Sequence, residues 1–334
     1  MSVKIVKNLS QWFLANSRDL PWRKNPDPYS VWLSEIMLQQ TQVTTVLPYF
    51  ARFKKAFPKI ENLAHAPLDE VLKLWAGLGY YSRARNLHQG AQAIAERLEN
   101  GSGFPKNRAE WLAIPGVGEY TAGAVTSISL NQREAIVDGN VVRVLSRIYA
   151  IPKLDAKKTV IWDKARELVN VKNAEPRILN QALMELGALV CKPRNPNCDS
   201  CPVSKDCQGK GRPDLYPEPK AKTKWKHLKE EKWVFLKGEE SDFEVYLEKN
   251  LDTRWRQGLW DFPDAGSVPI SKAALQSELL VKYTVTNHKI ERKHSVFVLS
   301  PRSREKGRGQ WFKFSDLPAL PSPVSKALRK VQDR

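Results

Sequence analysis

The sequence feature that most constrains the fold is a change of period near residue 210. Up to about Lys210, apolar residues recur every three to four positions, which predicts helices over 61–78, 82–100, 158–171 and 177–190. Beyond residue 228 the segments are short, partly alternating and rich in β-branched and aromatic residues. These segments predict strands over 232–238, 242–250, 282–293 and 294–300.

A Pro- and Lys-rich stretch with neither period, residues 209–228, separates the two patterns and is typical of an interdomain linker. The 334 residues are enough for two domains of ordinary size. We therefore expect a multidomain chain, first α and then α+β. Its parts are a helical domain over 1–210, a linker over 211–228 and a sheet-containing domain over 229–334.

The net charge of +18 comes from 54 basic and 36 acidic residues and predicts a polyanionic partner. Nucleic acid is the first candidate and an anionic membrane surface the second. No apolar run reaches the roughly 18 residues needed to span a bilayer. The N-terminus lacks the features of a signal peptide and is more typical of a short amphipathic helix.

All four cysteines, Cys191, Cys198, Cys201 and Cys207, fall within 17 positions with the spacing C-x6-C-x2-C-x5-C. Such clustering indicates a metal site rather than disulfides spread along the chain. Four thiolates can hold a 4Fe–4S cluster or one zinc ion, and the spacing alone does not choose between them. The segment also carries basic residues that could contact phosphate, namely Lys192, Arg194, Lys205 and Lys210.

A glycine-containing turn over Gly116, Val117 and Gly118 separates two predicted short helices, within a helix-hairpin-helix over 108–130. Glycines let successive backbone N–H groups form an anion nest, and a helix N-terminus strengthens it. In a chain of charge +18 this turn predicts a contact with DNA phosphate that reads no sequence.

Two carboxylates stand out, and each has an ordinary alternative. Glu35 is the single charged residue in the stretch 29–51, so it lies either on a solvated face or in a dry pocket that raises its pKa. Asp138 precedes Gly139, Asn140 and a predicted helix, so it is either a simple N-cap or a carboxylate that also faces a bound nucleotide.

The combination of "IPGVGEYTAGAV", "VDGNVVRV" and the four-cysteine segment, in that order, resembles the helix-hairpin-helix DNA glycosylases. "LPWRKNPDPYSVWLSEIMLQQTQV" and "LWAGLGYYSRARN" narrow the resemblance to the MutY family, which removes adenine mispaired with 8-oxoguanine. The resemblance covers residues 12–208 nearly continuously. It implies a six-helix barrel and a 4Fe–4S module that includes residues 190–208.

The resemblance also implies roles for the catalytic residues. Glu35 is the general acid that protonates adenine N7, and Asp138 stabilises the cationic sugar and assists water. Asn140 orients Asp138, and Tyr120 supports the pocket. Relatives that also cut the DNA backbone carry a lysine where this chain has Tyr120, so we expect a monofunctional enzyme without strong lyase activity.

An extruded adenine needs a pocket, and its vacated place in the helix needs a filler. The resemblance assigns the pocket to Trp22, Arg23, Leu38 and Gln181, and the insertion near the lesion to Gln40 and Tyr81. Gln181 could instead belong to an ordinary amphipathic helix.

Residues 229–334 resemble the Nudix-like domain with which the family senses 8-oxoguanine, although the glutamates of the Nudix hydrolase box are not present. The family's Phe-Ser-His triplet corresponds to Thr286, Asn287 and His288, so Asn287 replaces the serine. We expect Asn287 and His288 to contact the lesion, the alternative for His288 being an ordinary surface position.

Two other functions stay open: a thymine or other mismatch glycosylase on the same scaffold, and a non-catalytic iron–sulfur protein that senses DNA damage or redox state. The expected partner is duplex DNA with an A:8-oxoguanine mispair. We further expect a monomer in a bacterial cytoplasm and no membrane association.

Overall fold

The computed structural model describes residues 1–155, 158–218, 224–238, 243–251, 255–268, 274–300 and 307–333. The chain divides into two compact units. One contains Met1–Val46, Phe57–Ala64 and Gln89–Ala221, and the other contains Leu47–Ala56, His65–His88 and Lys222–Arg334. The division predicted from sequence differs, because it assigns every residue up to 210 to one helical domain. Sequence period reports only local structure, whereas compactness depends on contacts between distant segments.

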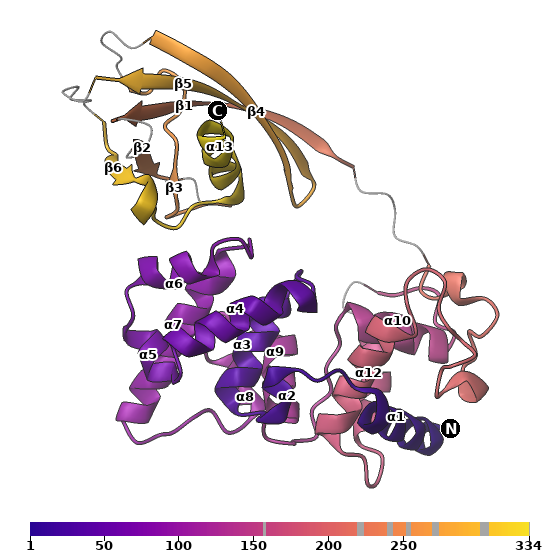
Figure 1. Ribbon diagram of the computed structural model, residues 1–334. Helices are drawn as coiled ribbons and strands as arrows, with labels where there is room; N and C mark the ends of the chain where they lie inside the picture. Colours follow the sequence, from indigo (N-terminus) through magenta and orange to yellow (C-terminus); the bar gives the residue numbers. More distant parts are fainter. Residues whose placement is uncertain are drawn as a thin grey trace. The chain divides into compact units, whose positions relative to one another are not determined.

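The helices occupy the N-terminal two thirds of the chain and its C-terminal end (Figure 1). They are α1 (Ser2–Asn16), α2 (Pro21–Lys24), α3 (Pro28–Leu38), α4 (Val43–Ala56), α5 (Ile60–His65), α6 (Leu68–Trp75), α7 (Ser82–Glu99), α8 (Arg108–Leu112), α9 (Glu119–Ile128), α10 (Gly139–Ile148), α11 (Thr159–Val169), α12 (Pro176–Leu189) and α13 (Ser322–Gln332). None of the described helices is long and apolar enough to span a membrane.

Local sequence explains where several helices begin. Asp27, Asn107 and Asp138 are the N-caps of α3, α8 and α10, and each side chain accepts a hydrogen bond from the backbone N–H three residues later. The helix predicted over 61–78 is two helices, α5 and α6, because Pro67 disfavours helical backbone at the residue before it.

Helix α3 is buried on all sides, since Tyr29 to Met37 are buried without interruption. A helix that is apolar around its whole circumference belongs in a protein interior. The solvated-face alternative for Glu35 is therefore wrong, because this carboxyl lies within that run and is 7% exposed.

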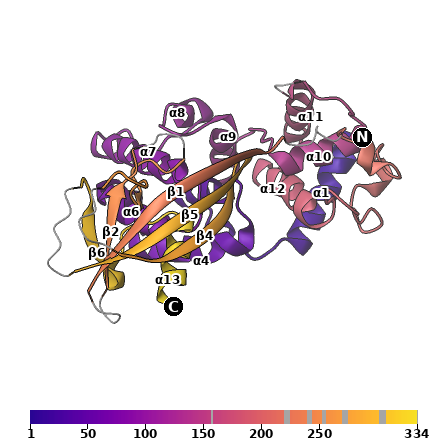
Figure 2. The ribbon, with the colours of Figure 1, turned by 90° about the horizontal axis from the view of Figure 1, so that it is seen from above.

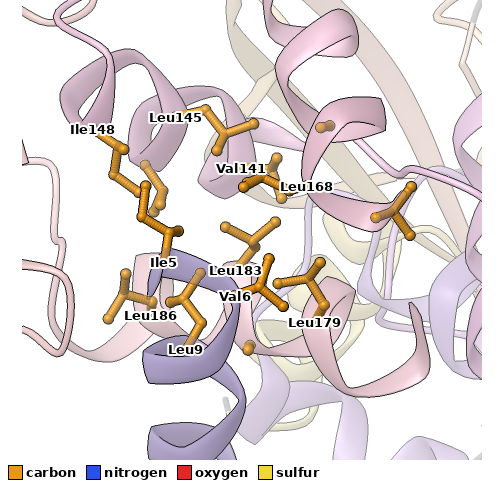
Figure 3. Close-up of a cluster of buried hydrophobic side chains, with 14 of the residues drawn as sticks. Ile5, Val6, Leu9, Val141, Leu145, Ile148, Leu168, Leu179, Leu183 and Leu186 are labelled. Atoms are coloured by element: carbon orange, nitrogen blue, oxygen red, sulfur yellow. The ribbon is translucent and has the colours of Figure 1, made fainter. Parts of the chain in front are cut away.

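The apolar core of the first unit is shared by α1, α10, α11 and α12 (Figure 3). Residues from one face of each helix interdigitate there: Ile5, Val6 and Leu9 from α1, Val141, Leu145 and Ile148 from α10, Leu168 from α11, and Leu179, Leu183 and Leu186 from α12. This core fixes α10 against α12, and both helices contribute polar side chains to one cavity.

The second unit contains a six-stranded mixed sheet within the described residues. Its strands are β1 (Lys226–Lys237), β2 (Glu244–Lys249), β3 (Trp260–Asp261), β4 (Ala274–Val285), β5 (His288–Leu299) and β6 (Gln310–Lys313). The order is β3-β2-β1-β5-β4, β6 also pairs with β2, and the long strands β1, β5 and β4 run side by side (Figure 2). Strand β1 is parallel to β5, the other pairs are antiparallel, and α13 packs apolar residues against the sheet.

The α+β character expected for the C-terminal part is present, but two strand predictions are wrong. The stretch 282–293 contains the end of β4, a tight turn and the start of β5, and β5 continues without a break to Leu299. Alternation of side chains does not mark this turn, because Thr286 and Asn287 reverse the chain in only two residues.

Candidate active site

A cavity of about 690 Å³ lies in the first unit. Segments far apart in the sequence line it: α2, α3 and the residues after it, α9, the start of α10, and α12. Nine residues predicted from sequence meet there, namely Trp22, Arg23, Glu35, Leu38, Gln40, Tyr120, Asp138, Asn140 and Gln181.

The Glu35 carboxyl has a strongly raised pKa. The Tyr120 hydroxyl donates a hydrogen bond of 2.6 Å to Glu35 Oε2. Burial raises the pKa of Glu35, the Tyr120 hydrogen bond lowers it, the charge of Asp138 raises it, and Arg23 lowers it. The result is a pKa of about 7, so Glu35 is protonated in a large fraction of the molecules near neutral pH.

Asp138 is both a helix cap and a cavity residue, so its role as an N-cap is confirmed, whereas its contact with a bound nucleotide stays a prediction. Its Oδ1 accepts a 2.7 Å hydrogen bond from the Val141 backbone N–H, and its Oδ2 accepts a 2.9 Å bond from Asn140 Nδ2. Arg143 Nη2 donates to Asn140 Oδ1 at 2.8 Å. Because the arginine can only donate, it fixes which end of the Asn140 amide faces Asp138.

Tyr120 lies in the first turn of α9 and connects two sides of the cavity. Its hydroxyl is close to both Glu35 and the sulfur of Met184, which is 3.4 Å away. No lysine occurs among the described residues that line the cavity. The lining therefore offers no amine nucleophile.

Sequence reasoning missed a third carboxyl group in this cavity, Glu185. Its side chain is 1% exposed and accepts hydrogen bonds from Arg18 Nη2 at 2.7 Å and from Arg23 Nη2 at 2.9 Å. Burial alone would raise the pKa of Glu185, but the bonds from Arg18 and Arg23 outweigh it and lower the pKa to about 2. The available signal was its spacing of four from Gln181, which places both polar residues on one helix face.

Arg23 connects Glu185 to the predicted adenine pocket. Its Nε donates to Gln181 Oε1 at 3.0 Å, and Gln181 Nε2 donates to the Arg177 carbonyl at 3.0 Å. Gln181 therefore has a fixed orientation in the cavity wall, and its side chain is more than an ordinary helix-face residue.

The structure corrects the assignment of Tyr81 as a residue inserted into DNA. Its ring is 4% exposed, its hydroxyl accepts a hydrogen bond from the Gly77 N–H, and it does not line the cavity described above. Its neighbour Tyr80 is 45% exposed and has a φ of 46°, in the left-handed region. Gln40 is likewise exposed, with a φ of 59°. Tyr80, rather than Tyr81, is therefore the tyrosine of this pair that a bound molecule could reach, and Gln40 is also accessible to solvent.

The glycine turn lies between α8 and α9, and Gly116 has a φ of 77°, which favours glycine. Gly118 is the N-cap of α9. The assignment of Val117 to the anion nest is wrong, because its N–H donates to the Ile114 carbonyl and its side chain is buried. Val117 thus stabilises the turn and does not offer its N–H to phosphate.

The predicted lesion-contact residues lie at the turn between β4 and β5. Asn287 and His288 are half-buried, and the Asn287 carbonyl accepts a 2.9 Å bond from the Lys226 N–H. The His288 ring meets the Trp255 ring nearly edge-on, with centroids 4.9 Å apart. The two residues therefore occupy a well-defined turn on the second unit.

The four cysteines line a cavity of about 30 Å³ in the first unit. Burial, and the negative charges of the other three cysteines, raise the pKa of the Cys201 thiol to about 11. No group of three or more His, Cys, Asp or Glu side chains among the described residues is arranged to hold one metal ion. The donor set of four thiols that line this cavity fits the chemistry of either a 4Fe–4S cluster or one zinc ion.

Comparison with known proteins agrees with this geometry. The family model of the HhH-GPD superfamily base excision DNA repair proteins matches residues 33–169, which contain Glu35, Tyr120 and Asp138. Residues 33–169 are thus similar to the helix-hairpin-helix base excision repair proteins.

Curated relatives narrow the class. Adenine DNA glycosylase of Rattus norvegicus is 47% identical over 229 residues, which cover 63% of this chain but only 43% of the relative. Adenine DNA glycosylase of Buchnera aphidicola subsp. Schizaphis graminum is 36% identical over 257 residues, or 76% of this chain and 72% of the relative. The chain belongs to the adenine DNA glycosylase family.

Among solved structures, a thermostable thymine-DNA glycosylase is 30% identical, with a TM-score of 0.56 over 62% of this chain and 95% of that one. This likeness shows that the helical scaffold is shared by glycosylases named for different bases.

Proposed function

We infer that the chain is a monofunctional DNA glycosylase that hydrolyses the N-glycosidic bond of adenine mispaired with 8-oxoguanine or guanine in duplex DNA. The observation that carries this proposal is the buried Glu35 carboxyl, which shares one cavity with Asp138 and has a pKa of about 7. The names of the curated relatives support adenine as the base.

The two carboxyl groups match the two requirements of the reaction. Protonated Glu35 donates its proton to adenine N7, so that the electrons of the breaking C1′–N9 bond leave on a neutral base. Ionised Asp138 stabilises the positive charge that develops on the sugar and accepts a proton from the attacking water. The hydrogen bonds from Val141 and Asn140 hold the Asp138 carboxylate in place for this role.

The remaining cavity residues suit a flipped purine. The volume of about 690 Å³ lies within the usual range of ligand sites, roughly 300–1,000 Å³. Trp22 and Leu38 supply apolar surface, and the network of Arg23, Gln181 and Glu185 supplies fixed polar groups.

The presence of Tyr120 in place of a lysine is the reason why we expect no cleavage of the DNA strand by lyase chemistry. A lysine amine at this position could attack C1′ and form a Schiff base, whereas the Tyr120 hydroxyl cannot and already bonds Glu35. We therefore expect an intact strand with an abasic site as the product.

The DNA contacts belong to the same proposal. Exposed Gln40 and Tyr80 are suited to fill the space left by the extruded base, and the α8–α9 turn is suited to grip phosphate. The C-terminal unit would serve as a Nudix-like reader of 8-oxoguanine through Asn287 and His288. The monomeric state and the bacterial cytoplasmic location stay predictions.

The proposed cofactor is one 4Fe–4S cluster held by Cys191, Cys198, Cys201 and Cys207. Metal binding would deprotonate these thiols despite their burial. When bound, the cluster supplies structural cross-linking of the segment. Iron and acid-labile sulfide in equal amounts in the purified protein would support it, and zinc in their place would contradict it.

One assay tests the activity. Duplexes with A opposite 8-oxoguanine, A opposite G, or T opposite G are incubated with the protein and then treated with hot alkali. We expect strand cleavage only with the adenine duplexes and only after alkali. Cleavage before alkali would contradict the role of Tyr120, and cleavage at T would favour the thymine enzyme. Binding without cleavage would favour the non-catalytic sensor.

A variant pair makes the assay sharper. Asp138→Asn should bind the duplex normally but excise adenine roughly 10²–10³-fold more slowly, because it loses preorganised negative charge at the sugar. Asp163→Asn, an exposed change on α11, is the control and should leave the rate unchanged.

A further inference from the structure

A buried arginine, Arg147, contacts the segment that carries the cysteines at several points. Arg147 lies in the last turn of α10 and is 4% exposed. Its Nη1 donates to the Lys192 carbonyl at 2.7 Å and lies 3.3 Å from Cys191 Sγ. Its Nη2 donates to the Pro193 carbonyl at 3.1 Å. One guanidinium therefore holds the start of the segment 191–216, hereafter the cysteine segment.

The same guanidinium also holds the end of the cysteine segment. Arg147 Nε donates to the Pro213 carbonyl at 3.1 Å and to the Tyr216 carbonyl at 3.3 Å. The backbone carbonyl of Arg147 accepts a 2.8 Å bond from the Gly209 N–H. Both ends of the segment are thus tied to one residue of a helix whose opposite face is packed in the apolar core.

The hydrogen bonds that hold the two ends of the cysteine segment together, which we call its closure, involve protein atoms alone. Bringing the ends of a long irregular segment together costs conformational entropy, which these hydrogen bonds offset. The guanidinium is suited to this, because its rigid fork of five N–H donors serves several carbonyls at once.

The charge of Arg147 gives a second, independent indication that this residue acts on the cysteine site. Arg147 lines the small cavity that the four cysteines line. None of the ion pairs between described residues involves Arg147, so its buried charge has carbonyl dipoles and a sulfur as neighbours but no carboxylate. A buried cation is stable only when it is compensated. Thiolates that hold a metal group would provide that negative charge.

We propose that Arg147 is the positioning residue of the cysteine segment: it ties residues 191–193 to residues 213–216, presents the four thiols around one cavity, and compensates the negative charge of the thiolate-bound metal group. The part that concerns metal rests on the cofactor named under Proposed function, whereas the closure of the segment does not.

The first experiment measures metal retention in the full-length protein as purified. Arg147→Met removes every donor, Arg147→Lys keeps the charge but not the fork, and Arg166→Met, which removes an exposed arginine of α11, is the control. Removing a group that orients metal ligands typically weakens binding 10–100-fold, so we expect iron release to a chelator about 10–100-fold faster for Arg147→Met. The lysine variant should be intermediate, and release at the wild-type rate from both would overturn the proposal.

A second variant covers the case in which Arg147→Met does not fold. A Cβ added at Gly209 would lie 2.6 Å from the Arg147 carbonyl oxygen and 3.2 Å from its carbonyl carbon. Gly209→Ala therefore forces the end of the segment away from α10 while the guanidinium remains. It should also release iron faster, and unchanged release would contradict the closure.

Proteolysis separates this proposal from the cofactor proposal. After chelation of all metal, trypsin should cut at Lys205 and Lys210 faster in Arg147→Met or Gly209→Ala than in the wild-type protein, at equal thermal stability of the helical core. Equal cleavage rates would overturn the closure. If the purified wild-type protein holds neither iron nor zinc, the cofactor proposal fails, and the proteolysis result still decides the role of Arg147.

Discussion

At the scale of single residues, the cavity keeps two buried carboxyl groups in opposite protonation states. Glu35 receives one neutral hydrogen bond from Tyr120 and has a pKa of about 7. Glu185 receives charged hydrogen bonds from Arg18 and Arg23 and has a pKa of about 2. The difference lies in the donors, because guanidinium groups repay the desolvation of a carboxylate and a hydroxyl does so only in part.

Tyr120→Phe tests the control of the Glu35 pKa. The lost hydrogen bond lowers that pKa in the wild-type protein, so the variant should have a higher one. The proposed mechanism requires protonated Glu35, so the fall in rate with rising pH should occur at higher pH in the variant. Single-turnover rates across a pH series measure this. Tyr29→Phe, which changes a buried tyrosine outside the cavity, is the control, and an identical midpoint for Tyr120→Phe would contradict the assignment.

Glu35→Gln tests the same group through stability. The native pKa is raised from 4.5 to about 7, so the folded state keeps the proton to higher pH than the unfolded state. The free energy of unfolding therefore declines as pH rises from 4.5 to 7, by about 3 kcal/mol in total. Glutamine does not titrate. The variant should gain stability relative to wild type across this interval in urea unfolding, and a difference independent of pH would contradict the raised pKa.

At the scale of elements, helix α10 links the candidate active site to the cysteine segment. Asp138 caps its first turn, Arg143 fixes Asn140 and also donates to the Cys191 carbonyl, and Arg147 lies in its last turn. The apolar face of the helix packs on α1 and α12 (Figure 3). The position of the catalytic carboxylate therefore depends on how closely α10 and α12 approach.

Gly187→Ala tests this approach. A Cβ at position 187 of α12 would lie 2.6 Å from the Asn140 Cβ, so the helices must separate. We expect a loss of about 1–3 kcal/mol in the free energy of unfolding, as in other overpacked cores, together with slower excision because Asn140 moves. Gly118→Ala is the stability control, since its Cβ would meet nothing within 4 Å. Equal stabilities of the two variants would contradict a tight contact between position 187 and Asn140.

At the scale of the whole molecule, positive charge dominates. The net charge of +18 agrees with a family that acts on DNA. Charge of this size favours association with a polyanion without selecting a sequence. Selection of a base must then come from other contacts, for which the cavity is the candidate.

Affinity for duplex DNA should therefore depend steeply on salt. If six to ten phosphates are contacted, binding should weaken by about 10³–10⁵ between 50 and 200 mM salt. Fluorescence anisotropy with an undamaged duplex measures the slope, and Asp138→Asn should share it because that change leaves the phosphate contacts intact. A nearly flat dependence would contradict the interpretation of the charge.

Much of the architecture was accessible from the sequence because it depends on local pattern. Three of the four helical stretches, the cap at Asp138 and the α+β character after the linker follow from period and capping chemistry. The isolated charge of Glu35 in an apolar stretch left a solvated face and a dry pocket as alternatives, and the structure shows the carboxyl buried.

Only the tertiary structure decided how distant residues meet. Glu35, Tyr120, Asp138 and Glu185 share one cavity although they belong to four separate helices or caps, and the pKa values of Glu35 and Glu185 depend on their neighbours there. It also decided that Tyr81 is buried while Tyr80 is exposed, which a run of two tyrosines cannot reveal. The physical reason is that burial and charge compensation are properties of a three-dimensional environment, whereas period and capping act within a few residues of the chain.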